Sequence, residues 1–116
     1  MKYKISQIEK LDFKNKKMND NEIIFIFQYN FNELLYLNLE NSNITNEGLI
    51  GLQNESLANL NYLNLSKNKI SDEGLKYLNY LKNLKELILL NMNLSDNCFL
   101  ILEKLYFNFT EQREII

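Results

Sequence analysis

Apolar positions follow two alternating patterns along the chain. Leu63 and Leu65 flank the polar Asn64, and a period of two predicts a β-strand that buries one face. A little further on, Leu75 and Leu78 stand three residues apart, which is the spacing of neighbours on one face of a helix. The same succession occurs elsewhere in the chain, so the pattern predicts alternating strands and helices.

This succession is a sequence repeat. With a shift of 26 residues, residues 34–52 match residues 60–78 at seven positions, a further unit follows after 24 residues, and a weaker one precedes by 26. The matched positions are Leu34, Leu37, Leu39, Ile44, Gly48, Leu49 and Leu52; Leu60, Leu63, Leu65, Ile70, Gly74, Leu75 and Leu78; Leu84, Leu87, Leu89, Leu94, Cys98, Phe99 and Leu102; and Ile8, Leu11, Phe13, Met18, Glu22, Ile23 and Ile26. We therefore expect one domain over residues 1–116, with repeats at about 8–33, 34–59, 60–83 and 84–106 and a C-terminal tail or cap at 107–116.

Helix-start signals agree with this division. The position before each expected helix holds Asn19, Thr45, Ser71 or Ser95, which are all residues that cap helix N-termini. Acidic residues follow in each first turn, where the positive end of the helix dipole favours them. These acidic residues are Asp20, Glu22, Glu47, Asp72, Glu73 and Asp96.

The string LxxLxLxxN, followed by an isoleucine and a GLxxL helix, resembles the leucine-rich repeat family, with a likeness to the ribonuclease-inhibitor-like class and its short repeats of 24–26 residues. The resemblance implies an α/β fold, a right-handed solenoid of about four strand–helix repeats with a parallel concave sheet and convex helices. In the family, the asparagine satisfies backbone groups where the chain leaves the strand. Here only Asn68 fits this position, because Lys16, Ser42 and Met92 replace it elsewhere, so we expect an incomplete asparagine ladder.

Composition limits the range of functions. The chain has 116 residues, 46% of them apolar, with 13 basic and 15 acidic residues, so nothing in the charge balance predicts nucleic-acid binding. No stretch approaches the roughly 20 apolar residues of a membrane span. The single Cys98 excludes an intrachain disulfide, and the N-terminus lacks a signal-peptide pattern, so we expect a cytoplasmic protein.

Catalytic residue patterns are missing from the sequence. The chain has no histidine, which removes Ser-His-Asp and Cys-His nucleophiles. Cys98 stands where the other repeats have a glycine, so it is interpreted as a small core residue. No metal or phosphate-loop motif occurs in the chain, and we therefore expect no cofactor, no metal and no enzymatic activity.

Binding is then expected on the concave face of the sheet, between the buried leucines. The predicted contact residues are Lys10, Tyr36, Tyr62 and Glu86 in one column, Asp12, Asn38, Asn64 and Ile88 in the next, and Glu40, Ser66 and Leu90 in a third that begins with Lys14. Tyr36 and Tyr62 suit protein recognition, because tyrosine supplies contact area at low entropy cost. Alternatively, the paired tyrosines and asparagines only stabilise neighbouring strands, and both interpretations stay open.

The last repeat is apolar where the others are polar. Ile88 and Leu90 occupy outward strand positions, and residues 99–102 are all apolar. Three explanations remain: the tail with Phe107, Phe109, Ile115 and Ile116 covers this end, further repeats are missing, or a partner covers it. The first hypothesis for function is thus a protein-binding module. The alternatives are self-assembly or a subunit-scaffold role through the C-terminal repeat, and the recognition part of an effector or ubiquitin-ligase adaptor.

Overall fold

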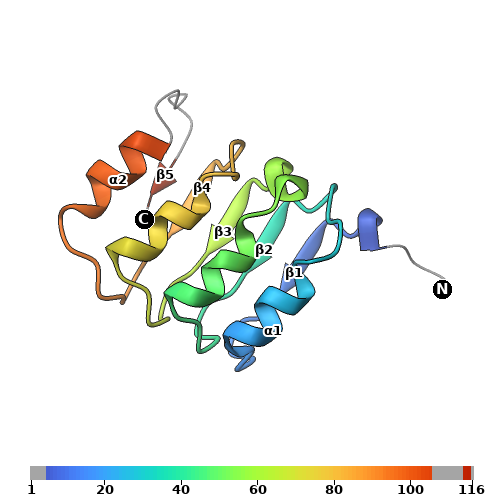
Figure 1. Ribbon diagram of the computed structural model, residues 1–116, viewed down its shortest axis with the longest axis horizontal. Helices are drawn as coiled ribbons and strands as arrows, with labels where there is room; N and C mark the ends of the chain where they lie inside the picture. Colours follow the sequence, from blue (N-terminus) through green and yellow to red (C-terminus); the bar gives the residue numbers. More distant parts are fainter. Residues whose placement is uncertain (1–4, 106–113, 116) are drawn as a thin grey trace.

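Five parallel strands form one sheet in sequence order. The computed structural model describes residues 5–105 and 114–115. The strands are β1 (Lys10–Asp12), β2 (Tyr36–Asn38), β3 (Tyr62–Asn64), β4 (Glu86–Ile88) and β5 (Glu114–Ile115). Figure 1 shows the helical segments lined up side by side in the same order as the strands, from the N-terminal repeat at one end to the C-terminal repeat at the other. The expected α/β solenoid of strand–helix repeats is confirmed.

The strand register is the one that the repeat predicts. Leu11 pairs with Leu37, Leu37 with Leu63, and Leu63 with Leu87. This column points into the core, where Leu37 and Leu63 are fully buried. Burying one leucine side chain stabilises the fold by about 1.5–3 kcal/mol, and a slip of one residue would move the whole column to the solvent side.

The convex segments differ from the expected α-helices in the middle repeats. Among the described residues, only α1 (Asn19–Ile26) and α2 (Cys98–Leu105) are α-helical, whereas η2 (Asn46–Leu52) and η4 (Asp72–Leu78) are 3₁₀ helices. A 3₁₀ helix rises about 2.0 Å per residue and brings residues i and i+3 onto one line. The buried pairs Leu49 with Leu52 and Leu75 with Leu78 therefore fit this geometry directly.

Two shorter 3₁₀ turns were not expected. The first is η1 (Ile5–Gln7), and the second is η3 (Glu55–Asn59), which buries Leu57 and is capped by the Asn54 side chain. The η3 turn lies just after η2, in the segment that makes the second repeat longer than the third. A longer repeat is thus accommodated by an extra turn that contributes a core residue.

Thr45 and Ser71 immediately precede their helices as predicted, whereas Asn19 is the first residue of α1 and Ser95 lies three residues before α2. Asn19, Thr45 and Ser95 accept hydrogen bonds from the backbone N–H groups of Glu22, Glu47 and Asn97. Ser71 makes no cap bond, because its hydroxyl instead accepts a hydrogen bond from the Asn46 side chain at 2.8 Å.

A ladder of side-chain hydrogen bonds connects consecutive repeats on the convex side. The Asp20 carboxylate accepts both the backbone N–H and the hydroxyl of Thr45, and the Asp72 carboxylate does the same for Ser95. Asn46 binds Ser71 in the equivalent place. The acidic residues assigned from sequence to the helix dipole thus also join one repeat to the next, and we call these three pairs the inter-repeat ladder.

Glycines make room for this ladder. A Cβ atom on Gly48 would lie 2.4 Å from Asp20 Oδ1, and one on Gly74 would lie 2.2 Å from Asn46 Oδ1. A larger residue at Gly48 or Gly74 would therefore displace the ladder side chain of the repeat before it.

Asn68 makes the densest polar network of the interior. Its Oδ1 accepts the N–H groups of Ser42 and Ile44, both at 3.0 Å, and its Nδ2 donates to the carbonyls of Leu39, Leu65 and Ser66. In the preceding repeat, the Ser42 hydroxyl lies within hydrogen-bond distance of only two carbonyls, those of Phe13 and Glu40. The asparagine ladder is incomplete here, as the departure of the sequence from the family pattern predicted.

The C-terminal tail contributes β5, which pairs with β4 in parallel. The expected contacts of Phe107, Phe109 and Ile116 lie outside the described residues.

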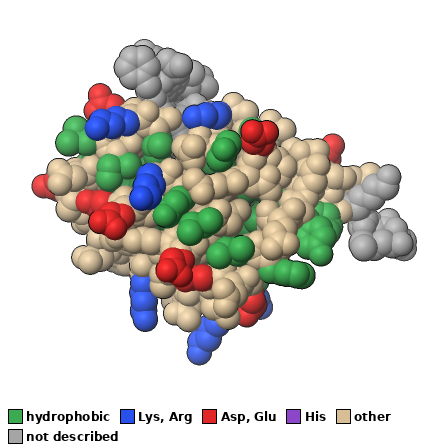
Figure 2. All heavy atoms as spheres, in the orientation of Figure 1, with side chains coloured by type: hydrophobic (Ala, Val, Ile, Leu, Met, Phe, Trp, Pro, Cys, Tyr) green, Lys and Arg blue, Asp and Glu red, His purple; other side chains and the backbone are tan. Residues whose placement is uncertain are grey.

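Figure 2 shows hydrophobic side chains on the surface in small groups, with acidic and basic side chains between them. Within the described ranges, no helix has the length and apolar character that crossing a membrane requires.

Candidate functional site

A row of four side chains crosses the sheet on the face away from the core. The register places Lys10, Tyr36, Tyr62 and Glu86 on adjacent strands. The tyrosine rings stack at a centroid distance of 4.3 Å and an interplanar angle of 4°, and the Lys10 Nζ atom lies 4.6 Å from the Tyr36 centroid. We call this the tyrosine row. It has a cation at one end and a carboxylate at the other.

The two tyrosines are half-buried against the sheet, whereas Lys10 and Glu86 are exposed. Burial, followed by the neighbouring Tyr36, raises the pKa of Tyr62 above its ordinary value of 10.0. The hydroxyl of Tyr62 is therefore protonated at neutral pH, so it offers both a donor and an acceptor. Stacking also restricts the rings, so less side-chain entropy remains to be lost when a partner binds.

The second predicted column is mostly not available for binding. Asn38 and Asn64 are only 6% and 5% exposed, because their Oδ1 atoms accept the N–H groups two residues further on, at 3.0 and 2.9 Å. Asp12 makes the same turn with Lys14 but stays exposed, and Ile88 is half-buried. Little of Asn38 and Asn64 is therefore available to a partner, and their role as contact residues stays a prediction. They hold the chain where it turns out of the strand.

The third column centres on Glu40. Its carboxylate lies 3.6 Å from Lys14 Nζ and 4.0 Å from Lys67 Nζ, and it accepts a hydrogen bond from the Asn64 amide at 3.0 Å. Ser66 is buried, and its hydroxyl accepts the Leu90 N–H at 2.9 Å. The role of Ser66 as a contact residue stays a prediction that its burial does not favour, whereas Leu90 is exposed and Glu40 is half-buried.

The fold and the repeated side chains agree with a comparison against known families. Residues 33–52 and 56–78 each match the family model described as a leucine-rich repeat. These two segments are leucine-rich repeats. The match is to the repeat in general, so the likeness of this chain to the ribonuclease-inhibitor-like class stays a prediction. No curated protein matches the sequence at a significant level.

Members of the leucine-rich repeat family generally mediate protein–protein interaction and are typically non-catalytic. The described part of this chain holds no group of three His, Cys, Asp or Glu side chains that could bind a metal ion. Cys98 is 5% exposed, and burial, followed by the charges of Asp72 and Asp96, raises the pKa of its thiol. The protonated thiol packs in the position that glycine fills in the middle repeats.

Sequence reasoning missed a polar hollow where the chain turns from strand to convex segment. A cavity of about 400 Å³ is lined there by Asn15, Lys17, Asn41, Asn43, Lys67, Asn68 and Lys69. Asn15, Asn41 and Lys67 occupy equivalent positions of three repeats and have φ of 64°, 52° and 59°. Asparagine tolerates this left-handed conformation better than most residues, and recurrence of Asn at this position was a usable sequence signal.

Proposed function

We propose that this protein is a non-catalytic binding module that holds a protein partner against the tyrosine row. The observation that carries the proposal is the stacked pair of Tyr36 and Tyr62, which lies on the sheet face away from the core. Tyrosines are enriched at the energetic centres of protein interfaces, where they combine an apolar ring with a polar end.

The neighbours of the tyrosine pair carry opposite charges, so the two ends of the tyrosine row differ. Lys10 lies over the Tyr36 ring, and Glu86 follows Tyr62 on the next strand. A partner with an apolar centre, an acidic group on the Lys10 side and a basic group on the Glu86 side would match this row. Charges at the edge of an interface set orientation and association rate more than affinity. Asp12, Glu40, Ile88 and Leu90 remain candidates for further contacts around the row.

The test compares partner capture by the wild-type protein and by a Tyr36→Ala/Tyr62→Ala variant, followed by measurement of the captured partner's affinity with purified components. Truncating residues at the centre of an interface commonly costs 2 kcal/mol or more, so we expect affinity to fall at least roughly tenfold.

The matched control is Tyr29→Ala, which removes an exposed tyrosine from the convex side, where its ring contacts Phe25. This control should bind normally. Circular dichroism must show that both variants are folded. Full affinity of the double variant, or an equal loss in the control, would rule out the tyrosine row as the binding surface.

The cytoplasmic location stays a prediction from the sequence. It is independent of the binding proposal, and fractionation of the tagged protein tests it separately.

A further inference from the structure

The polar hollow at the turn from strand to convex segment is built from two columns of equivalent residues. One column contains Asn15, Asn41 and Lys67, and the other contains Lys17, Asn43 and Lys69. Within each column, successive residues are 26 positions apart in the sequence. The hollow therefore extends across the first three repeats, all of them within the described residues.

Backbone hydrogen bonds between repeats hold the walls of the polar hollow in place. The Asn15 N–H donates to the Glu40 carbonyl at 3.0 Å, and the Asn41 N–H donates to the Ser66 carbonyl at 2.9 Å. The buried Asn68, which also lines the hollow, is bonded to backbone groups of two repeats. The hollow is thus formed before a ligand arrives, which lowers the entropy cost of binding.

The charged side chains that line the polar hollow are all lysines, namely Lys17, Lys67 and Lys69. All three are exposed, and Lys17 and Lys69 have no ion-pair partner within residues 5–105. Lys67 lies 4.0 Å from the Glu40 carboxylate, which is closer to Lys14, at 3.6 Å. The hollow therefore carries positive charge that the surrounding side chains do not neutralise.

Lys67 has a backbone conformation that lysine rarely adopts. Its φ of 59° lies in the left-handed region, and the equivalent positions of the other repeats hold Asn15, Asn41 and Asn91. Asparagine tolerates this region better than lysine does, so a lysine at this position costs stability. The exposed ion pair with Glu40 compensates little, whereas a role of Lys67 in binding an anion accounts for the strained residue.

Asparagine amides add neutral hydrogen-bond donors to the lysines. Asn41 Nδ2 donates to Asn15 Oδ1 at 2.8 Å, and this bond fixes the orientation of the Asn15 amide. Among the described residues, Asn15 Nδ2 has no hydrogen-bond partner, so it can donate to a ligand. The volume of about 400 Å³ lies within the range of small-molecule sites.

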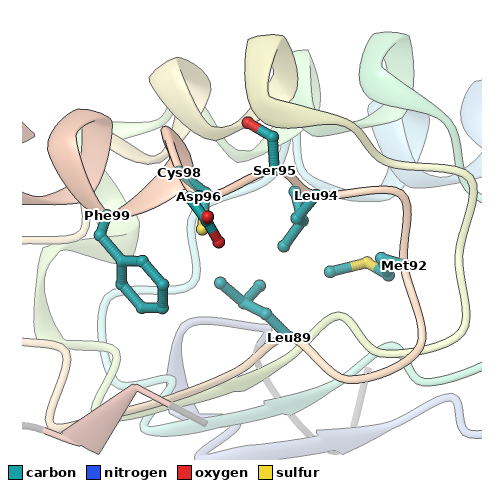
Figure 3. Close-up of a pocket in the computed structure, with 7 residues that line it drawn as sticks. All are labelled: Leu89, Met92, Leu94, Ser95, Asp96, Cys98 and Phe99. Atoms are coloured by element: carbon teal, nitrogen blue, oxygen red, sulfur yellow. The ribbon is translucent and has the colours of Figure 1, made fainter.

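A second hollow, of about 250 Å³, lies in the last repeat and differs in chemistry. Figure 3 shows the apolar side chains of Leu89, Met92, Leu94 and Phe99 around this space, with the Asp96 carboxylate beside them. Its lining contains no basic side chain, and a carboxylate repels anions. The second hollow therefore serves as an internal control for anion binding.

We propose that the polar hollow binds a phosphate group. A phosphate monoester carries about −1.5 to −2 charges at neutral pH and has three strong acceptor oxygens, so one group can bind several lysines and an amide together. A carboxylate has one charge and two oxygens, and it matches three lysines less well. The site shares no lining residue with the tyrosine row and does not depend on the proposed function.

The probe is inorganic phosphate, titrated into the ¹⁵N-labelled full chain at constant ionic strength and followed by NMR. We expect saturable shift changes at residues 15–17, 41–43 and 67–69, and none at residues 89–99 around the second hollow. Acetate, titrated in the same way, supplies a carboxylate and should bind more weakly because it carries less charge.

Two further ligands identify the source of the phosphate group. Methyl phosphate presents it in a small molecule, and a phosphoserine tripeptide presents it on a protein side chain. Tighter binding of the tripeptide than of inorganic phosphate and methyl phosphate would assign the site to a phosphorylated side chain. Equal or weaker binding of the tripeptide would assign it to free phosphate or a small phosphate ester.

Variants of the protein separate binding from stability. Lys67→Asn introduces the residue that the other repeats have at this position. We expect it to lower the affinity for phosphate by at least roughly tenfold, since a hydrogen bond between charged groups is lost. Its midpoint of urea unfolding without phosphate should equal or exceed that of the wild type, because the strain at this position is relieved.

Lys69→Gln should lower the affinity for phosphate to a similar extent. Lys85→Gln, which removes an exposed lysine outside the hollow, is the charge-matched control and should bind like the wild type.

Three outcomes would overturn the proposal. The first is shift changes that do not saturate with phosphate or that acetate reproduces at the same concentrations. The second is shift changes of equal size at residues 89–99. The third is wild-type affinity for phosphate in both Lys67→Asn and Lys69→Gln.

Discussion

Replacing Asn68 with alanine is expected to destabilise the protein more than its single side chain suggests. The Asn68 amide is 6% exposed and bonds to backbone groups of two consecutive repeats. Alanine leaves the N–H groups of Ser42 and Ile44 without the Oδ1 acceptor that they share at 3.0 Å. It also removes the donor to the carbonyls of Leu39 and Leu65, at 2.8 and 2.9 Å.

The size of the effect follows from the two orphaned N–H groups. A buried donor left without a partner costs about 1–3 kcal/mol, and the lost carbonyl bonds add a smaller net contribution. Partial relaxation and entry of water reduce the sum, so we expect a loss of about 3–5 kcal/mol in the free energy of unfolding. That loss is a large fraction of the stability of a typical domain.

The assay is equilibrium unfolding in urea, with the slope of free energy against urea compared between variants. Asn68→Ser should lose less than Asn68→Ala, because Ser42 shows that a hydroxyl in this position bonds to two carbonyls. Asn32→Ala, at an exposed asparagine, should stay within about 0.5 kcal/mol of the wild type. A loss below about 1 kcal/mol for Asn68→Ala, at unchanged slope, would refute the reasoning.

Three further substitutions test other contacts. The hydroxyl and N–H of Ser95 lower the pKa of Asp72 below its ordinary value of 3.8, so its contribution to stability is present above pH 3.8 and is lost as the pH falls through the lower folded-state pKa. Asp72→Asn should therefore reduce the acid dependence of unfolding, and an unchanged pH profile would contradict this. Gly74→Ala should displace the Asn46 side chain and lower the free energy of unfolding in urea by about 1–2 kcal/mol. Wild-type stability would show that the Asn46 side chain can move aside without loss of stability. Leu63→Ala should lower the free energy of unfolding by about 2–5 kcal/mol, since the side chain is fully buried, and thermal unfolding near the wild-type midpoint would argue against the assigned register.

Sequence reasoning predicted the strand register correctly because the register depends on the spacing of equivalent residues. A period of two around Leu63 predicted which residues face the core, and the shift of 26 predicted that Tyr36 and Tyr62 lie on adjacent strands. The sequence pattern could not predict whether the convex segments are α-helices or 3₁₀ helices. An i, i+3 pair such as Leu49 and Leu52 is compatible with both an α-helix and a 3₁₀ helix.

The binding surface was predicted only in part. Alternation placed Asn38 and Asn64 outward, but their amides turn back to accept backbone N–H groups two residues on. Short polar side chains often bond to the local backbone in this way, so an outward strand position does not guarantee an exposed side chain. Tyr36 and Tyr62 are too large for such a turn, and their rings stay on the surface.

The sequence by itself determined the repeat, its period and the pairing of equivalent residues, because hydrophobic spacing and helix caps act over a few neighbouring residues. Only the tertiary structure decided which side chains join one repeat to the next. The bonds from Asp20 to Thr45 and from Asp72 to Ser95 span 25 and 23 residues. They form only when stacking brings equivalent positions of consecutive repeats together.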